Sequence, residues 1–237
     1  MTGILQLAKD AADELSLTRP GSLSTTTTDA TAQKLFRHLT RTCRQLSARY
    51  DWQRLRKEKT FVTVAAATQT NATATDFLRF VEMTIFNRTK RRHVKGPMTS
   101  LEWQSYQAST ITPVLETFYM RGNAFLITPT PAAGETIAYE YITKNIGMDS
   151  LSVTEKDSFT DDADITFFDD ELVVLGTVWR YRKSEGLDYS EEFREFELRF
   201  ADLVKMDGGR RRLDMNDNTM DRTPNVQGSE IDFFVST

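Results

Sequence analysis

The chain has 237 residues, of which 39% are hydrophobic and 27% are charged, and its formal net charge is -4. This size allows one large domain or two small ones with a sizeable core, while the negative charge excludes the strongly basic balance of a dedicated nucleic-acid-binding protein. Cys43 is the one cysteine, so no internal disulfide can form. No apolar run reaches the roughly 20 residues of a transmembrane helix, and residues 1–15 lack the positive start of a signal peptide, so we expect synthesis in a reducing cytoplasm and no membrane contact.

Two amphipathic helices are predicted at the start of the chain. Apolar residues recur at helical spacing over residues 3–15, and Arg19-Pro20-Gly21 ends the pattern. After a Ser/Thr-rich link, Asp29 is a suitable N-cap for a longer helix that reaches Tyr50. The expected buried face of that longer helix contains Ala32, Leu35, Phe36, Leu39, Cys43, Leu46 and Tyr50.

The next part of the chain has the pattern of β-strands. Residues 61–64 and 77–85 are rich in β-formers. Residues 65–75, between them, are small and polar, so we expect a loop that adds nothing to the core. Thr99 and Glu102 match a capping box that opens a short helix.

A hairpin and a further strand follow this short helix. Residues 115–120 and 124–127 flank Arg121-Gly122-Asn123, which predicts a hairpin with a three-residue loop. Beyond a Pro- and Gly-containing turn, apolar and other residues alternate, which predicts a half-buried strand. The residues expected on its buried face are Ile137, Tyr139 and Tyr141.

An acidic, loop-like segment at residues 145–170 precedes another helix. Leu172, Leu175 and Trp179 recur at helical spacing and form an apolar stripe, so this helix should be buried along one side. Gly186 suits the left-handed position that ends a helix.

The last predicted helix follows after only two or three residues, so the pair should pack as an antiparallel helical hairpin. Asp188 and Glu191 match a capping box at its start, and Gly208-Gly209 ends it. One face carries an aromatic seam that we expect to form the core of the hairpin. The residues of this seam are Tyr189, Phe193, Phe196, Phe200 and Leu203.

These patterns predict an α+β fold in three parts. Residues 1–56 and 145–207 form a helical bundle of two N-terminal and two C-terminal helices, residues 57–144 an antiparallel β-rich insertion, and residues 208–237 an extended C-terminal arm. The arm is too polar to form a core. Either its apolar end docks on another protein or its aromatic residues are incidental. Its candidate contact residues are Arg210, Arg211, Arg212, Ile231, Phe233, Phe234 and Val235.

No catalytic or metal-binding motif stands out. The acidic residues before and within the start of the helical hairpin could supply oxygen ligands to calcium or magnesium, but their spacing matches no calcium loop, which favours a solvated loop with helix N-capping. His38 and His93 match no ligand spacing, and Cys43 is expected in the core rather than as a nucleophile. We therefore predict no cofactor and no enzyme. The acidic residues in question are Asp157, Asp161, Asp162, Asp164, Asp169, Asp170 and Glu171.

A basic run is the strongest signal for nucleic-acid contact. Such a density of positive charge suits phosphate contacts without sequence preference, although a charged edge strand is the favoured interpretation of the run alone. We keep it as a candidate for a DNA channel or a subunit contact. Its residues are Arg88, Lys90, Arg91, Arg92 and Lys95.

Several motifs in the same order resemble the head-to-tail adaptor (connector) proteins of short-tailed bacteriophages. The helical hairpin, residues 170–193, carries the resemblance most strongly, and it extends over roughly residues 1–215. The other matching motifs are Ala11-Ala12-Asp13-Glu14-Leu15 before Arg19-Pro20, Arg49-Tyr50-Asp51-Trp52, Gly96-Pro97 before Trp103, and Tyr139-Glu140-Tyr141-Ile142 before Lys144-Asn145.

The resemblance implies a structural virion protein in the neck of the phage. Proteins of this family form a homo-oligomeric ring, usually a dodecamer, below the portal protein. DNA passes through the ring during ejection, and the tail nozzle or tail fibre proteins attach beneath it. Carried over to this chain, the arm at residues 208–237 would reach the portal and the β-rich insertion at residues 57–144 would face tail components.

The charge distribution suits a ring, because residues 145–171 are acidic whereas residues 34–59 and 88–95 are basic. Two other classes stay open from the residues alone. One is a metal-dependent hydrolase that uses Asp161, Asp162 and Asp164, and the other is a soluble DNA-binding protein that uses the basic run, although no recognition-helix pattern supports it.

Overall fold

The computed structural model describes residues 2–23, 29–109, 115–151 and 153–208. These residues form five α-helices and three antiparallel sheets, which confirms the predicted α+β class. The helices are α1 (Ile4–Glu14), α2 (Ala30–Arg49), α3 (Ser100–Ala108), α4 (Asp170–Ser184) and α5 (Ser190–Asp207), with a short 3-10 helix η1 (Gln53–Leu55). The strands are β1 (Arg56–Val62), β2 (Thr68–Gln69), β3 (Phe77–Phe80), β4 (Phe86–Asn87), β5 (Arg92–His93), β6 (Thr117–Arg121), β7 (Ala124–Thr128), β8 (Thr136–Thr143), β9 (Gly147–Met148), β10 (Glu155–Lys156) and β11 (Ile165–Thr166).

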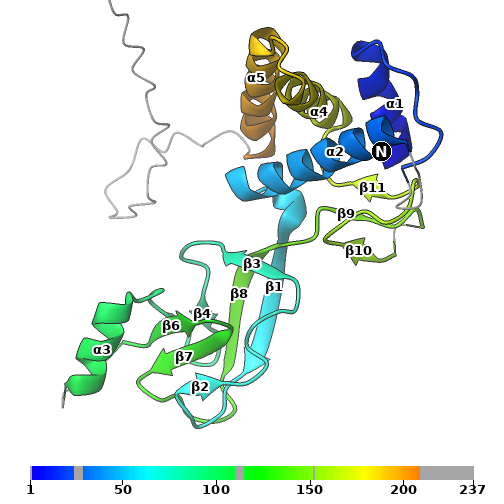
Figure 1. Cartoon of the computed structure of the whole chain (residues 1–237). Helices are drawn as coiled ribbons and strands as arrows, with labels where there is room; N and C mark the ends of the chain where they lie inside the picture. The colour runs from blue at the N-terminus through cyan, green and yellow to red at the C-terminus, as the bar shows by residue number, and fades with distance from the viewer. Residues whose placement is uncertain (1, 24–28, 110–114, 152, 209–237) are drawn as a thin grey trace, which may run out of the picture.

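The elements gather at two ends of an elongated molecule (Figure 1). Helices α1, α2, α4 and α5 lie at one end with the small sheet β10-β9-β11, and the remaining strands lie at the other end with α3. Strands β1 and β8 pair along their whole length and run from one end toward the other. Each end has its own cluster of buried apolar side chains.

The two N-terminal helices form as predicted. Ile4, Leu7 and Ala11 of α1 are buried, and the side chain of Asp29 caps α2 by accepting a hydrogen bond from the backbone of Thr31. The buried face of α2 includes most of the expected residues, although Phe36 and Tyr50 are only partly buried. Amphipathic spacing therefore fixes both helices and the side that each turns to the core.

Helix α4 is the centre of the helical end, because α1, α2 and α5 all pack against it. The prediction of burial along one side is wrong. Residues from Leu172 to Tyr181 are buried on nearly every side, and Leu175 of the predicted stripe is the half-buried exception. A helix enclosed by three others needs small or apolar residues all round, so a single stripe underestimates its burial.

Helices α4 and α5 run antiparallel, as predicted. Arg182 pairs with Glu192 at one end of the contact and Asp169 pairs with Arg199 at the other. The connection spans residues 185–189, which is longer than the predicted two or three residues. Gly186 has φ 74°, and the backbone N–H of Leu187 donates to the carbonyl of Arg182, the hydrogen bond of a Schellman ending.

The start of α5 differs from the prediction. Its N-cap is Tyr189, whose side chain makes no capping hydrogen bond, so the expected capping box of Asp188 and Glu191 is wrong. Asp188 instead accepts hydrogen bonds from the backbone and hydroxyl of Ser190. The helix ends at Asp207, with Gly208 as its C-cap, where the glycine signal placed it.

Strand β8 is the centre of the largest sheet, between β1 on one side and β3 and β4 on the other. Ile137, Tyr139 and Tyr141 are buried as predicted, but Ala138 and Ile142 are buried too, so the expectation of a half-buried strand is wrong. The reason is that Ile142 belongs to the helical core, while the start of the strand belongs to the β core.

Three segments that were expected to be loops or longer turns contain more structure. Residues 65–75 include β2, and Ala72 is 2% exposed in the β core. Residues 145–170 include β9, β10 and β11. In the β6–β7 hairpin Arg121 pairs with Ala124, so the turn has two residues, and Gly122 takes φ 57° at the first central position.

The capping box of Thr99 and Glu102 at the start of α3 is confirmed.

Candidate functional site

The basic run occupies the β4–β5 hairpin at the outer edge of the largest sheet. Strand β5 is the last strand in the order β1-β8-β4-β5, as a charged edge strand would be. Arg91 takes φ 54° in the turn between the two strands. The five cations predicted as one group do not act together, because two of them are paired inside the chain.

Lys90 turns inward to a buried acidic pair. Its Nζ lies 2.5 Å from Oε1 of Glu116 and 2.7 Å from Oε1 of Glu135. Asn87, which is fully buried, donates to the second oxygen of each carboxylate at 3.0 and 2.7 Å. The hydrogen bonds that Lys90 donates to the two carboxylates raise its pKa. Burial alone would raise the pKa of Glu135, but Lys90 and Asn87 lower it.

The remaining cations of the run face outward. Arg88 pairs with Glu58 at 2.9 Å on the surface. Arg91, Arg92 and Lys95 are exposed and form no ion pair with any residue that the structure describes. These three side chains are therefore the part of the run that is available to phosphates or to a neighbouring acidic surface.

The aromatic seam of the helical hairpin divides into two contacts. The Trp179 ring lies 5.3 Å from Phe193, 6.1 Å from Phe196 and 6.2 Å from Tyr189, measured between centroids. Phe200 instead lies 5.9 Å from Trp52. Phe196 is fully buried, whereas Phe193 is 40% exposed, so the seam covers only part of α5.

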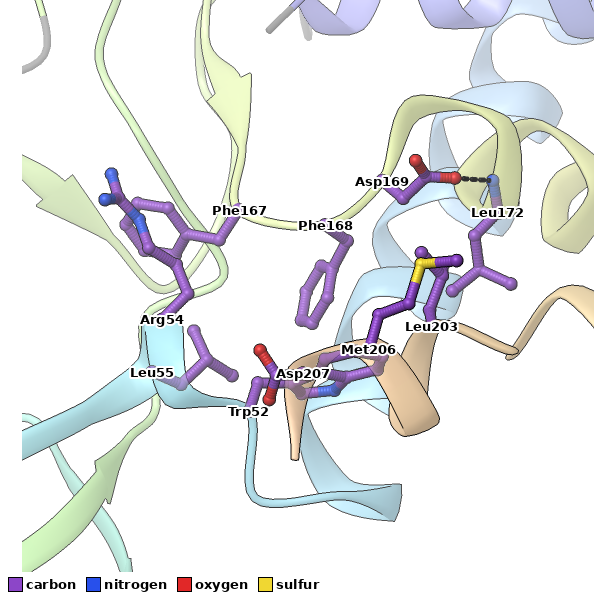
Figure 2. Close-up of a pocket in the computed structure, with 10 residues that line it drawn as sticks. All are labelled: Trp52, Arg54, Leu55, Phe167, Phe168, Asp169, Leu172, Leu203, Met206 and Asp207. Atoms are coloured by element: carbon purple, nitrogen blue, oxygen red, sulfur yellow. Dashed lines mark hydrogen bonds between the residues drawn. The ribbon is translucent and has the colours of Figure 1, made fainter. Parts of the chain in front are cut away.

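A cavity of about 350 Å³ opens where α5 ends (Figure 2). The turn after α2 supplies Trp52 and Leu55 to its wall, and the segment before α4 supplies Phe168. The indole N–H of Trp52 donates to the carbonyl of Leu46, and Asp169 caps α4 by accepting from the N–H of Leu172. No local pattern predicts this cavity, because its walls come from three separate parts of the chain.

The acidic loop is held by interactions within the protein. Asp164 is fully buried and accepts from Lys156 at 2.7 Å and from the N–H groups of Thr160 and Asp161. Burial would raise the pKa of Asp164, but these donors lower it. Asp162 accepts from the N–H of Leu23. The expectation of a solvated loop is therefore wrong for Asp164, while the expected N-capping by Asp169 is confirmed.

The other predicted chemical residues are far apart. Cys43 is fully buried in the core as predicted, and burial raises the pKa of its thiol to about 12. His38 lies on α2 at 6.2 Å from the Tyr181 ring, and His93 is exposed on β5. Within the described ranges, no three His, Cys, Asp or Glu side chains are grouped as metal ligands. None of the described helices is long and apolar enough to span a bilayer.

The predicted arm residues lie outside the described part of the chain, so the structure gives no account of them. They are Arg210, Arg211, Arg212, Ile231, Phe233, Phe234 and Val235.

Comparison with known proteins supplies the family. A search among curated proteins finds no match. The family model described as SU10 adaptor protein matches residues 2–225, which covers both ends of the molecule and the strands between them. The chain therefore belongs to the SU10 adaptor protein family, a family of phage head-to-tail adaptors.

Proposed function

We propose that copies of this protein form a closed ring, a dodecamer, between the portal and the tail nozzle or tail fibres, with DNA passing through its centre. Family membership makes the protein a structural component of the virion that contacts other head or tail proteins.

The observation that carries the proposal is the incomplete burial of α5. Phe196 alone is buried among its side chains, while Phe193 is 40%, Leu198 57% and Met206 74% exposed. Leu198 and Met206 are eight positions apart and so share one side of the helix, and exposed apolar side chains that share a side suit a surface that another protein covers. A neighbouring subunit packed against this helix would remove them from water.

The second part of the proposal concerns the β-rich insertion, residues 57–144. It has its own buried core and lies at the end of the molecule away from α5 (Figure 1). Met83 is 60% and Leu101 80% exposed there, which supports contact with a tail component. The helical part, residues 1–56 and 145–207, would then supply the ring, and residues 208–237 would form the arm to the portal.

The third part concerns DNA. Arg91, Arg92 and Lys95 are exposed cations without internal ion pairs among the described residues, and they suit non-specific contact with the DNA backbone. Lys90 and Arg88 do not belong to this proposed DNA surface, because each is paired with a glutamate. Replacing Arg91 and Arg92 by glutamate should impair DNA retention or ejection, and unchanged behaviour would refute this part.

Electron microscopy of the full-length protein, alone and mixed with the portal protein, tests the main proposal. We expect rings of uniform subunit number that stack on the portal. A protein that stays a single chain in both samples, at micromolar concentration and low salt, would overturn it.

A further inference from the structure

A second cavity, of about 330 Å³, lies between α2 and α4 and has a strongly positive wall. It is separate from the basic run and from the cavity at the end of α5. Its lining residues are His38, Arg41, Trp179, Arg180, Lys183 and Ser184.

Arg180 is the central feature of this cavity. The residue is only 7% exposed, yet its guanidinium group donates to two neutral acceptors, Oγ1 of Thr42 at 3.0 Å and Oε1 of Gln45. Its guanidinium carbon lies 4.2 Å from the ring centre of Trp179. No carboxylate in the described part of the chain pairs with it. Burying a charge without a counter-ion costs free energy, so a bound anion would stabilise Arg180 in this cavity.

The surroundings strengthen this requirement. Arg41 and Lys183 add positive charge to the same wall, and neither forms an ion pair with a described residue. Burial, together with Arg41 and Arg49, lowers the pKa of Arg180 to about 10. The indole Nε1 of Trp179 is buried and has no acceptor among the described residues. The cavity wall thus carries an excess of positive charge and suits a ligand with negatively charged acceptor atoms.

The same chain carries a matching acidic surface on the other side of α4. Glu14 of α1 and Glu195 of α5 are exposed and form no ion pair with a described residue. Burial, then Glu195, Asp10 and Glu171, raise the pKa of Glu14, and the nearby Arg182 opposes them. Glu171 and Arg180 are nine positions apart on α4, or about 2.5 turns, so they point to opposite sides of the helix.

We propose that the cavity at Arg180 receives Glu14 and Glu195 of the next copy of the chain. Opposite charges on opposite faces suit a head-to-tail contact, in which one patch meets a different patch on its neighbour and the repeat closes as a ring. This inference rests on the proposed ring and names the charges that join its subunits.

Two charge-reversal variants of the full-length protein test it. The first is Arg41→Glu with Lys183→Glu, which makes the cavity acidic. The second is Glu14→Lys with Glu195→Lys, which makes the acidic surface basic. All four side chains are exposed, so folding should persist and circular dichroism can verify it. We expect each variant alone to lose the ring, with and without portal.

The equimolar mixture of the two variants is the decisive sample. In the mixture each reversed cavity meets a reversed surface of the other variant, so alternating rings should reappear by native mass spectrometry and electron microscopy. Arg121→Glu with Lys144→Glu is the matched control, because it reverses two exposed cations on the β half and should leave rings intact.

The possible failures are distinguishable. If wild-type protein forms no ring with or without portal, both the proposed function and this inference are refuted. If wild type forms rings and the cavity variant forms them equally well, or the mixture stays dissociated, this inference alone is overturned. Intact rings that have lost DNA contact in the cavity variant would assign the site to phosphates and also overturn it.

Discussion

The Nζ of Lys90 lies 2.7 Å from Oε1 of Glu135, so a residue of the basic run neutralises a carboxylate that is only 7% exposed. The same Nζ also pairs with Glu116, whose side chain is 4% exposed. Glu116 precedes β6, Glu135 precedes β8 and Lys90 follows β4, so one ammonium group joins three segments of the β half. Its role is therefore stabilising, which changes what its replacement should do.

Replacing Lys90 by methionine should destabilise the protein by about 2–3 kcal/mol. Two buried carboxylates would lose their cation, and breaking a buried pair costs about 3–5 kcal/mol; the partial exposure of Lys90 reduces that figure. Thermal and urea unfolding would measure the change. Arg92→Met, at an exposed position on β5, is the control and should change stability by less than about 0.5 kcal/mol. Equal stability of the two variants would contradict this account.

Asp76 belongs to a hydrogen-bond network at the junction between the two ends of the molecule. It accepts from Tyr141 and Thr143 of β8 and from Lys57 of β1. Lys57 in turn donates to Glu155 of β10 at 2.6 Å. Burial alone would raise the pKa of Asp76, but hydrogen bonds from Lys57 and the two hydroxyl groups lower it to about 2.

A carboxylate whose folded pKa is lowered contributes stability above its unfolded pKa and loses it as pH falls through the folded value. The contribution of Asp76 should therefore be complete above about pH 4 and disappear near pH 2, where its folded pKa lies. We expect Asp76→Asn to be less stable than wild type by about 2 kcal/mol at pH 7 and to converge with it toward pH 2. Urea unfolding across this range checks it, and a constant difference would contradict the assignment.

Gly176 allows α2 and α5 to approach α4. A Cβ at this position would lie 2.3 Å from Cγ2 of Thr42 and 3.0 Å from Phe196. Gly176→Ala should thus destabilise by about 1–3 kcal/mol through overpacking, although alanine is the better helix former. Gly21→Ala is the control, since nothing lies within 4 Å of its added Cβ. A stabilised Gly176→Ala variant would show that the helices can separate at little cost.

The helices were predictable because their signals are local. The N-cap at Asp29, the capping box of Thr99 and Glu102, and the stop at Gly186 all act within a few residues of where they stand in the sequence. Helical spacing also predicted most of the core face of α2, and the short connection after α4 predicted the antiparallel hairpin. The resemblance drawn from the order of such motifs agrees with the family match.

The features that the sequence did not predict depend on contacts between distant segments. In the sequence Lys90 resembles the other surface cations of the run, and only the structure shows that it pairs with Glu116 and Glu135. Strands β9, β10 and β11 have two residues each, too few for a periodic pattern. Arg180 reads as part of the charged end of α4, and its burial follows only from the position of α2.

Ring assembly should weaken with salt. The cations at the Arg180 cavity and the carboxylates of Glu14 and Glu195 would attract across the proposed head-to-tail contact, and added ions screen charges that remain exposed. Sedimentation of the full-length protein at about 0.05 M and 0.5 M sodium chloride, where screening differs strongly, should show fewer rings at the higher concentration. A ring whose stability does not change with ionic strength would mean that apolar contacts, such as those of α5, dominate assembly.

Removal of residues 210–237 should leave the ring intact and abolish portal binding. The apolar end of this segment is well suited to a groove on a partner, whereas the buried cluster at the helical end is built from residues that the structure describes. A full-length variant with Phe233→Ser and Phe234→Ser separates the effect of these side chains from that of chain length, and we expect it to bind portal at least tenfold more weakly. Co-sedimentation with portal and electron microscopy give the two readouts. Normal portal assembly by the truncated protein would show that the adaptor holds the portal through its folded part, and the arm would then have no docking role.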